Sequence, residues 1–364
     1  MKCLFFLFTC IPLMMHGQTL ELTVGTYTEN NQSEGVYRYA FDLRSGRTKP
    51  IDTVGTPNPS FLTLTSDKTY LYAVNEMPGG DGKVSAFKRN REQGYKLINQ
   101  VSSLGVAPCH ITLDPAENFL FVSNYGGGSL SVFQIGTDGG IDKPVQQFSF
   151  KGKGPDTRRQ SSSHVHSSTL SPDGKFLLVQ DLGTDNIRVF SFDPENRAAP
   201  LTLFNTVDTA PGGGPRHLAF SRSGRMLYLV EEMGSRISVF AFKQGKLSLL
   251  EQVSLLAPDY QGDTGAADVH ISPDGKFLYA SNRGDANTLS IFRITEEGRL
   301  DRIQQVSVLG KGPRSFMISP EGQYLLIANQ YSNQIKVFKR DKRSGKITDT
   351  GEDILVDAPV CLKF

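Results

Sequence analysis

The chain has 364 residues, more than one ordinary domain, so it holds either two domains or one large repetitive domain. Lysine and arginine total 39 against 37 acidic residues, and the formal charge of +2 is spread without a long run of one sign. This balance argues against nucleic acid or an anionic membrane as a partner and favours a small molecule. Beyond the N-terminal segment, no apolar run is long enough to span a bilayer.

Residues 1–17 have the anatomy of an export signal. A lysine at the second position and a mostly apolar stretch lead to Gly17, a small residue at the expected cut. A buried first strand is the alternative, but Leu20 to Thr28 already supplies that strand. Cys10 raises a lipoprotein interpretation, which the large residues before it disfavour. We expect a signal peptide over residues 1–17, a periplasmic or secreted product, and one domain over residues 18–364.

A unit of about fifty residues recurs through the rest of the chain. It begins with Pro-x-x and a short apolar run, turns at a Ser-Pro-Asp-Gly-like sequence, continues with an apolar run, and adds a Val-x-Phe strand. Six units are in register when they are aligned on the second position of this turn: seven residues before it lie Pro59, Pro108, Val165, Pro215, Ala266 and Pro313, and nine residues after it lie Asn75, Asn124, Asp181, Glu231, Asn282 and Asn329.

Each unit predicts a four-stranded antiparallel sheet, because it carries four short apolar runs separated by Gly, Pro, Asn and Asp. Helical periodicity is absent, and radial repetition of such sheets gives a propeller. A seventh unit is split between the ends of the chain. Residues 20–26, 35–41 and 50–54 read as its second to fourth strands, and Pro359 to Phe364 matches the missing first strand. The sequence therefore predicts an all-β, seven-bladed propeller of four-stranded antiparallel blades, closed by pairing of the C-terminal strand with the N-terminal strands.

The repeat also predicts where a site lies. The first strand of a blade starts on the same face of the disc where the antiparallel second strand ends, so polar residues at these positions converge at one mouth of the central channel. The residues expected there include Glu76, His110, Tyr125, His164, His166, Asp181, Arg216, His217, Glu231, Glu232, Arg283, Arg314 and Gln330.

The fourth unit departs from the others by placing Glu231 and Glu232 beside the pair Arg216 and His217. A carboxylate, a guanidinium and an imidazole on one rim suit ester or lactone hydrolysis, in which Glu or His activates water and Arg stabilises the oxyanion. A surface ion pair is the alternative. Alternation along a strand lets one of the two glutamates face the channel.

The connection from Lys151 to Ser163 is long and basic, and it is either a flap over this mouth or an ordinary solvated loop. The sequence has no Gly-x-Ser-x-Gly elbow and no zincin-type histidine pair, which disfavours covalent serine catalysis and helix-borne zinc. We expect no cofactor and no bound metal. Cys109 and Cys361 should not form a disulfide, because two blades separate their inner strands.

Several motifs together resemble those of one family, the seven-bladed propeller lactonases that include bacterial 6-phosphogluconolactonase and the fungal carboxymuconate-cyclising enzyme. The resemblance runs from about Leu22 to Phe364 and rests on residues 25–28, 58–62, 75–76, 124–128, 181–185, 214–217 and 281–284. It implies a catalytic set of His164 or His166, Arg216, Glu232 and Arg283. His110, His217, Asp181, Glu76 and Gln330 complete the expected site as substrate-binding residues.

The resemblance implies hydrolysis of a sugar-acid lactone, 6-phosphogluconolactone or a related one, by attack of water on the ring carbonyl. An export signal fits poorly with a cytoplasmic sugar-phosphate pathway, so the reaction type is better determined than the substrate. Two alternatives stay open. One is a calcium-dependent propeller lactonase with oxygen ligands in the channel, and the other is a non-catalytic exported propeller that binds a ligand.

Overall fold

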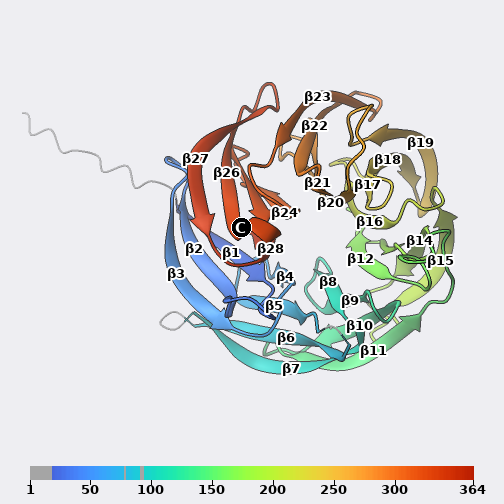
Figure 1. The fold of residues 1–364 in the computed structure, drawn as a ribbon. Coiled ribbons are helices and arrows are strands. Elements are labelled where there is room, and N and C mark those ends of the chain that lie inside the picture. The colour runs from blue at the N-terminus through green and yellow to red at the C-terminus, as the bar shows by residue number, and fades with distance from the viewer. Residues whose placement is uncertain (1–18, 78, 91–93) are drawn as a thin grey trace, which may run out of the picture.

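The computed structural model describes residues 19–77, 79–90 and 94–364 of the protein. Within these residues, 28 strands form seven sheets of four strands, and each sheet is one blade. The blades are arranged in a ring, with the first strand of each blade towards the centre (Figure 1). This confirms the predicted seven-bladed propeller. The expected signal peptide falls on residues 1–17, which lie outside the described part of the chain.

The strands follow one another in blade order, and within each blade the first strand named lies innermost. The closing blade holds β28 (Pro359–Lys363), β1 (Thr19–Thr26), β2 (Gly35–Asp42) and β3 (Thr48–Gly55). The next three blades are β4 (Phe61–Leu64), β5 (Tyr70–Asn75), β6 (Asp81–Asn90) and β7 (Gly94–Val106); β8 (Pro108–Leu113), β9 (Phe119–Asn124), β10 (Ser129–Ile135) and β11 (Ile141–Ser149); and β12 (Val165–Leu170), β13 (Phe176–Asp181), β14 (Asn186–Phe192) and β15 (Leu201–Asp208). The last three are β16 (Pro215–Phe220), β17 (Met226–Glu231), β18 (Arg236–Lys243) and β19 (Lys246–Ser254); β20 (Thr264–Ile271), β21 (Phe277–Gly284), β22 (Thr288–Ile294) and β23 (Leu300–Ser307); and β24 (Pro313–Ile318), β25 (Tyr324–Asn329), β26 (Gln334–Arg340) and β27 (Ile347–Leu355), with a 3-10 turn η1 (Gln330–Ser332) after β25.

The ring closes as the sequence predicted. β28 pairs antiparallel with β1, with Leu362 opposite Val24 and Cys361 opposite Gly25. Gly25 is required at this contact, because a Cβ there would lie 2.4 Å from the carbonyl oxygen of Pro59. The closing blade thus combines both ends of the described chain. The edge of β1 that faces the centre of the ring is covered by β28 and is not exposed.

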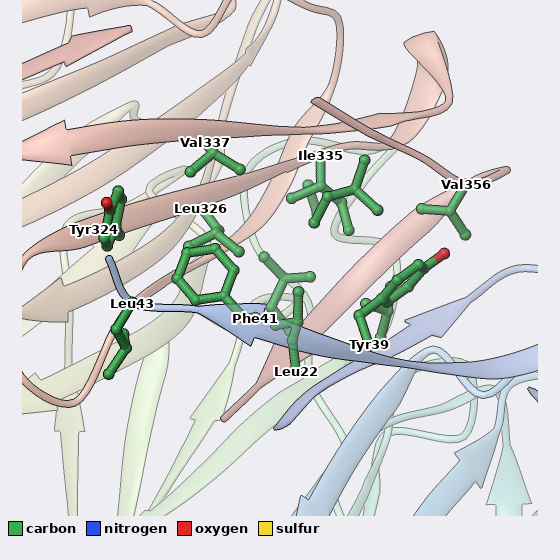
Figure 2. Packing of buried hydrophobic residues seen from close by; sticks show 13 residues of the cluster. Leu22, Tyr39, Phe41, Leu43, Tyr324, Leu326, Ile335, Val337 and Val356 are labelled. Atoms are coloured by element: carbon green, nitrogen blue, oxygen red, sulfur yellow. The ribbon is translucent and has the colours of Figure 1, made fainter. Parts of the chain in front are cut away.

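The core consists of apolar layers between neighbouring blades. At the closing seam, Leu22 and Phe41 of the closing blade are buried against Leu326 and Val337 of the last blade. Figure 2 shows these side chains meeting between the two sheets. Burial of apolar surface between consecutive blades stabilises the ring by roughly 25 cal/mol per Å² removed from water. The channel walls therefore remain available for polar residues.

Two further sequence predictions concern the chain as a whole. Cys109 and Cys361 are both buried free thiols, which confirms that they are not bridged. In residues 19–77, 79–90 and 94–364 the structure contains no helix with the length and apolar character needed to cross a membrane.

Candidate active site

Bulges in the inner strands place side chains at one mouth of the channel. In β8, β12, β16 and β24 the pairing with the second strand skips one residue, the second residue of the inner strand. The skipped residues are Cys109, His166, Arg216 and Arg314. A bulge interrupts the strict alternation of a strand and re-aims a side chain. These four side chains consequently gather at the mouth instead of alternating between the faces of their blades.

A second set of side chains comes from the residue that follows the second strand. The backbone N–H groups of Glu76, Tyr125 and Glu232 each donate to a carbonyl just before the inner strand of the same blade, at 3.1, 2.9 and 2.8 Å. This bond keeps the chain over the channel after β5, β9 and β17 end. Tyr27 occupies the corresponding position after β1.

The two sets enclose a polar cavity of about 280 Å³, which we call the central cavity. Its lining residues are Tyr27, Glu76, Cys109, Tyr125, Arg159, His166, Glu232, Arg283 and Arg314. Of the predicted catalytic residues, the structure brings His166, Glu232 and Arg283 into this lining, and Arg216 contacts it through Glu232.

Glu232 is the centre of an arginine cluster. Its Oε2 lies 3.0 Å from Nε of Arg216 and 2.8 Å from Nη2 of Arg283, and its Oε1 lies 2.6 Å from Nη2 of Arg159. The carboxylate is buried, with 8% of its side chain exposed. Charge-assisted bonds of this length fix both the carboxylate and the guanidinium groups. Two consecutive blades and one loop therefore meet at a single side chain.

The electrostatics of this cluster make Glu232 a poor proton acceptor. Burial alone would raise the pKa of Glu232, but the charges of Arg283, Arg216 and Arg159 outweigh it and hold the pKa well below its ordinary value. Burial, with the repulsion of Arg283 and Arg314, lowers the pKa of Arg216 to about 10, so that group stays charged at neutral pH. Glu232 is thus suited to position arginines, whereas its residue type alone would also have allowed it to activate water.

His166 has the properties that Glu232 lacks. Burial and the nearby charges of Arg216 and Arg314 lower the pKa of His166 well below 6.5, so its imidazole is neutral at neutral pH. Its Nδ1 is buried without a hydrogen-bond partner among the described residues. The ring packs edge-on against Tyr125, with 5.6 Å between ring centroids. A neutral, unengaged imidazole beside several guanidinium groups can accept a proton from water.

His164, the other predicted histidine, supports the wall of the cavity from behind. Its ring stacks on Tyr125 at 4.5 Å, and its Nδ1 lies 3.0 Å from the carbonyl oxygen of the same residue. His164 is absent from the described lining of the central cavity. Of the two histidines, His166 is therefore the one that lines the central cavity.

The basic connection between Lys151 and Ser163 lies over this mouth, in agreement with the flap interpretation. Asp156 accepts from the backbone N–H groups of Arg158 and Arg159 at 2.9 and 3.1 Å, which orders the tip of the loop. Arg159 reaches Glu232, and these two residues line both the central cavity and a larger outer cavity of about 740 Å³. Their ion pair is the partition between the two spaces.

The adjacent glutamate and the equivalent aspartate point away from the channel. Glu231 is fully buried inside its blade, where it accepts from Arg236 and Ser238 at 2.5 Å each. Asp181 is likewise fully buried and accepts from Ser163 and Arg188 at 2.5 and 2.7 Å. The structure therefore separates Asp181 from the central cavity. Its place in the repeat is the structural position at the end of the second strand, where other blades have Asn.

His110 and His217 line a second cavity of about 450 Å³ towards the opposite end of the channel. His217 follows Arg216 in the chain, but the bulge in β16 directs the two side chains to different levels. Nδ1 of His217 lies 3.0 Å from Oδ1 of Asp268, and Oδ2 of Asp268 lies 3.1 Å from Nε2 of His270. The structure thus separates these two predicted substrate-binding residues from Glu232.

Glu76 and Gln330 lie on the far arc of the mouth. Both line a side cavity of about 330 Å³, which shares Tyr27 and Glu76 with the central cavity. The sequence pattern placed Arg314 and Tyr125 on the rim, but the predicted catalytic and binding set contained neither of them, nor Tyr27 or Arg159. The signal for Tyr27 was its place in the repeat after the second strand. No repeat position carries Arg159, because it lies in a connection.

A metal centre in a protein needs several His, Cys, Asp or Glu side chains, or backbone oxygens, converging on one point. In the described residues no group of three or more His, Cys, Asp and Glu side chains is arranged to hold a metal ion.

A closed ring of seven four-stranded blades with an arginine-rich cavity at one mouth defines a seven-bladed propeller with a polar small-molecule site. The family model described as "Lactonase, 7-bladed beta-propeller" matches residues 21–364. The chain belongs to this family of propeller lactonases.

Individual relatives agree with this assignment. A protein of Formosa agariphila named 6-phosphogluconolactonase is 37% identical over 347 residues, covering 94% of this chain and 98% of the relative. A Bacillus subtilis protein of the same name is 29% identical over 346 residues, with 94% and 97% covered. The solved structure of a periplasmic gluconolactonase from Pseudomonas aeruginosa matches with a TM-score of 0.90 and 37% identity, over 95% of this chain and 99% of that one.

Proposed function

We propose that this protein hydrolyses a sugar-acid lactone that carries an anionic substituent, and that 6-phosphogluconolactone is the first candidate. The observation that carries the proposal is the charge of the site. Three guanidinium groups, those of Arg159, Arg283 and Arg314, line one small cavity together with the carboxylates of Glu76 and Glu232, and a fourth, that of Arg216, contacts this cavity through Glu232. The positive excess favours an anionic substrate and an anionic transition state. The names of the Formosa and Bacillus relatives support the same choice.

In the proposed reaction, His166 acts as the general base. A water molecule attacks the ring carbonyl carbon while its proton passes to the imidazole, and the carbonyl oxygen becomes an oxyanion. Arg216 and Arg283 stabilise that oxyanion, because their guanidinium groups are held in place before the reaction begins. The carbon–oxygen bond of the ring then breaks, and the proton returns from His166 to the leaving ring oxygen. The product is the open-chain hydroxy acid.

Glu232 contributes by positioning the arginines. Without it, Arg216 and Arg283 would repel each other in a buried space, and neither would be fixed against the substrate. The low pKa of Glu232 keeps the carboxylate charged throughout the reaction.

The test is a panel of lactones, phosphorylated and unphosphorylated, with hydrolysis followed by acid release. We expect turnover of at least one sugar-acid lactone, and a loss of about a hundredfold or more in His166→Gln, which removes the base but preserves much of the volume. His164→Gln is the matched control, because that ring lies behind Tyr125, and it should retain more activity. An inactive wild-type protein across the panel would leave a ligand-binding propeller. Loss of activity on addition of a chelator, and its recovery on addition of calcium, would favour the metal-dependent alternative.

We further propose that the protein is exported. The support is the composition of residues 1–17 and the similarity to the Pseudomonas gluconolactonase, which is named as a periplasmic enzyme. Mass spectrometry of the protein from fractionated cells tests this. A product that begins near Gln18 in the exported fraction would agree, and an intact N-terminus in the cytoplasm would refute it.

A further inference from the structure

Arg314 is the one arginine of the central cavity lining that Glu232 does not hold. It is the bulge residue of β24, and 17% of its side chain is exposed. Its ion pair with Glu76 spans 3.9 Å, which is beyond hydrogen-bond distance. Within the described residues no hydrogen bond satisfies its guanidinium, whereas Arg159, Arg216 and Arg283 all bond to Glu232.

The neighbours of Arg314 leave its donors free. Oε2 of Glu76 already accepts from the hydroxyl of Tyr27 at 2.8 Å. The guanidinium lies over the ring of Tyr27, with its central carbon 5.4 Å from the ring centroid. Stacking of this kind holds the plane of a guanidinium while its N–H groups stay available at the edge. Burial opposes the charge of Arg314, but Tyr27 and Glu76 outweigh it and raise its pKa, so the group is a permanent cation.

Arg314 is a half-buried cation whose five N–H donors have no hydrogen-bond partner among the described residues, so they can be met by an anionic ligand that enters the cavity. Planar guanidinium groups match the geometry of phosphate and carboxylate oxygens through two parallel hydrogen bonds. The site is therefore built to receive an anion at Arg314, in a cavity of about 280 Å³ that also contains the reacting groups.

The position of Arg314 in the ring separates it from the reacting groups. Arg314, Tyr27 and Glu76 come from three consecutive blades, those of β24, β1 and β5. His166, Arg216 and Arg283 come from the consecutive blades of β12, β16 and β21, on the other arc of the same ring (Figure 1). A substrate whose carbonyl lies beside His166, Arg216 and Arg283 therefore presents its distal substituent to Arg314.

We propose that Arg314, stacked on Tyr27, is the subsite for the anionic substituent of the substrate, a phosphate ester or a carboxylate. This inference rests on the proposed lactone hydrolysis and assigns the recognition of the charged group to a residue outside the reacting cluster. Arg314 is then the residue that discriminates charged lactones from neutral ones.

The test compares kcat and KM for three substrates: 6-phosphogluconolactone, neutral glucono-δ-lactone and a carboxylate-bearing glucarolactone. In Arg314→Gln we expect kcat/KM to fall roughly ten- to hundredfold for the anionic lactone that the enzyme prefers, mostly through KM, with little change for the neutral one. Arg314→Lys should recover part of this loss, because it restores the charge without the bidentate fork. Arg299→Gln, at an exposed arginine paired with Glu251, is the matched control and should leave all three values unchanged.

Calorimetry with the reaction products gives a readout that does not depend on turnover. Arg314→Gln should weaken the binding of 6-phosphogluconate or of glucarate, and which product binds the wild type more tightly identifies the anionic group. Glu76→Gln should tighten that binding, because it removes a competing negative charge beside Arg314. Equal effects on charged and neutral compounds, or none, would overturn the inference. A wild type that binds these anions through Arg314 but hydrolyses no lactone would instead refute the proposed function.

Discussion

Nε of Arg216 lies 3.0 Å from Oε2 of Glu232, and the two side chains are 2% and 8% exposed. This ion pair is therefore buried, in contrast to the surface ion pair that the sequence left open as an alternative. Glu232→Ala would leave Arg216 and Arg283 without their counter-charge. We expect a loss of about 3–5 kcal/mol in the free energy of unfolding, measured by denaturant titration. A loss below about 1 kcal/mol would show that the pair behaves as an exposed one.

The same pair should matter for catalysis in variants that keep the volume. Glu232→Gln and Arg216→Lys should lower lactonase turnover on the order of a hundredfold at a temperature where both are folded, because the positioned positive charge is lost or displaced. Initial rates of acid release measure this, with circular dichroism as the check on folding. Near-wild-type rates in both variants would place the reacting groups elsewhere in the channel.

Glu231 should have the opposite profile to Glu232. It is fully buried, and it bonds to Arg236 and Ser238 within its own blade. Glu231→Gln should therefore lower the melting temperature while leaving turnover of the folded protein close to wild type. Thermal denaturation together with rate measurements below the transition tests both parts. Large equal losses of turnover at both glutamates would contradict the orientation in which only Glu232 reaches the cavity.

The activity should persist at mildly acidic pH. Neutral His166 is the reactive form of the proposed base, and its pKa is lowered well below 6.5 by burial and by Arg216. The fall in kcat/KM on the acid side should then occur well below pH 6.5 instead of near it. A pH–rate profile measured within the range where the protein stays folded gives the answer. An inflection at pH 6.5 or above would refute the assignment of His166 as this base.

Stability should fall in the same acidic range. Burial, then Arg216, lowers the pKa of His217 to about 4, although its bond to Asp268 favours the charged form. The unfolded imidazole binds a proton near pH 6.5 and the folded one near pH 4, so the unfolded state binds more protons between these values. His217 therefore contributes about 3 kcal/mol to the free energy of unfolding above pH 6.5, and this contribution is lost as the pH falls to 4. Melting temperatures across this window measure it, and His217→Asn should flatten the slope. An equally steep slope in that variant would exclude His217 as its source.

Closure of the ring should be essential for stability. Deletion of residues 359–364 removes β28 and exposes the edge of β1 that pairs with it. We expect a large drop in melting temperature, well beyond that caused by shortening the exposed loop 194–198. Differential scanning calorimetry of the two deletions makes the comparison. An unchanged transition in the first deletion would contradict the closure.

The repeat in the sequence was sufficient for the architecture. Hydrophobic alternation, the Asp-Gly turns and the match of Pro359 to Phe364 with other inner strands are local features, and local features decide strands, blade number and the pairing that closes the ring. The same register located the residue that follows each aligned Asn-type position, which is why Glu76, Glu232 and Arg283 were expected at one mouth and are found there.

The tertiary structure decided the composition of the site, because three of its features have no local signal. Bulges in the inner strands direct consecutive residues differently, so that Arg216 contacts Glu232 while the next residue, His217, lines the second cavity, and bulge positions depend on the pairing of two strands. The position of Arg159 depends on how a loop folds over the mouth. The roles proposed for Glu232 and His166 rest on the direction of their pKa shifts, which is set by burial and by charges that the fold brings near them. The sequence determines which residues can approach the channel. The distances between blades and loops determine which of these residues form ion pairs and which of them line the same cavity.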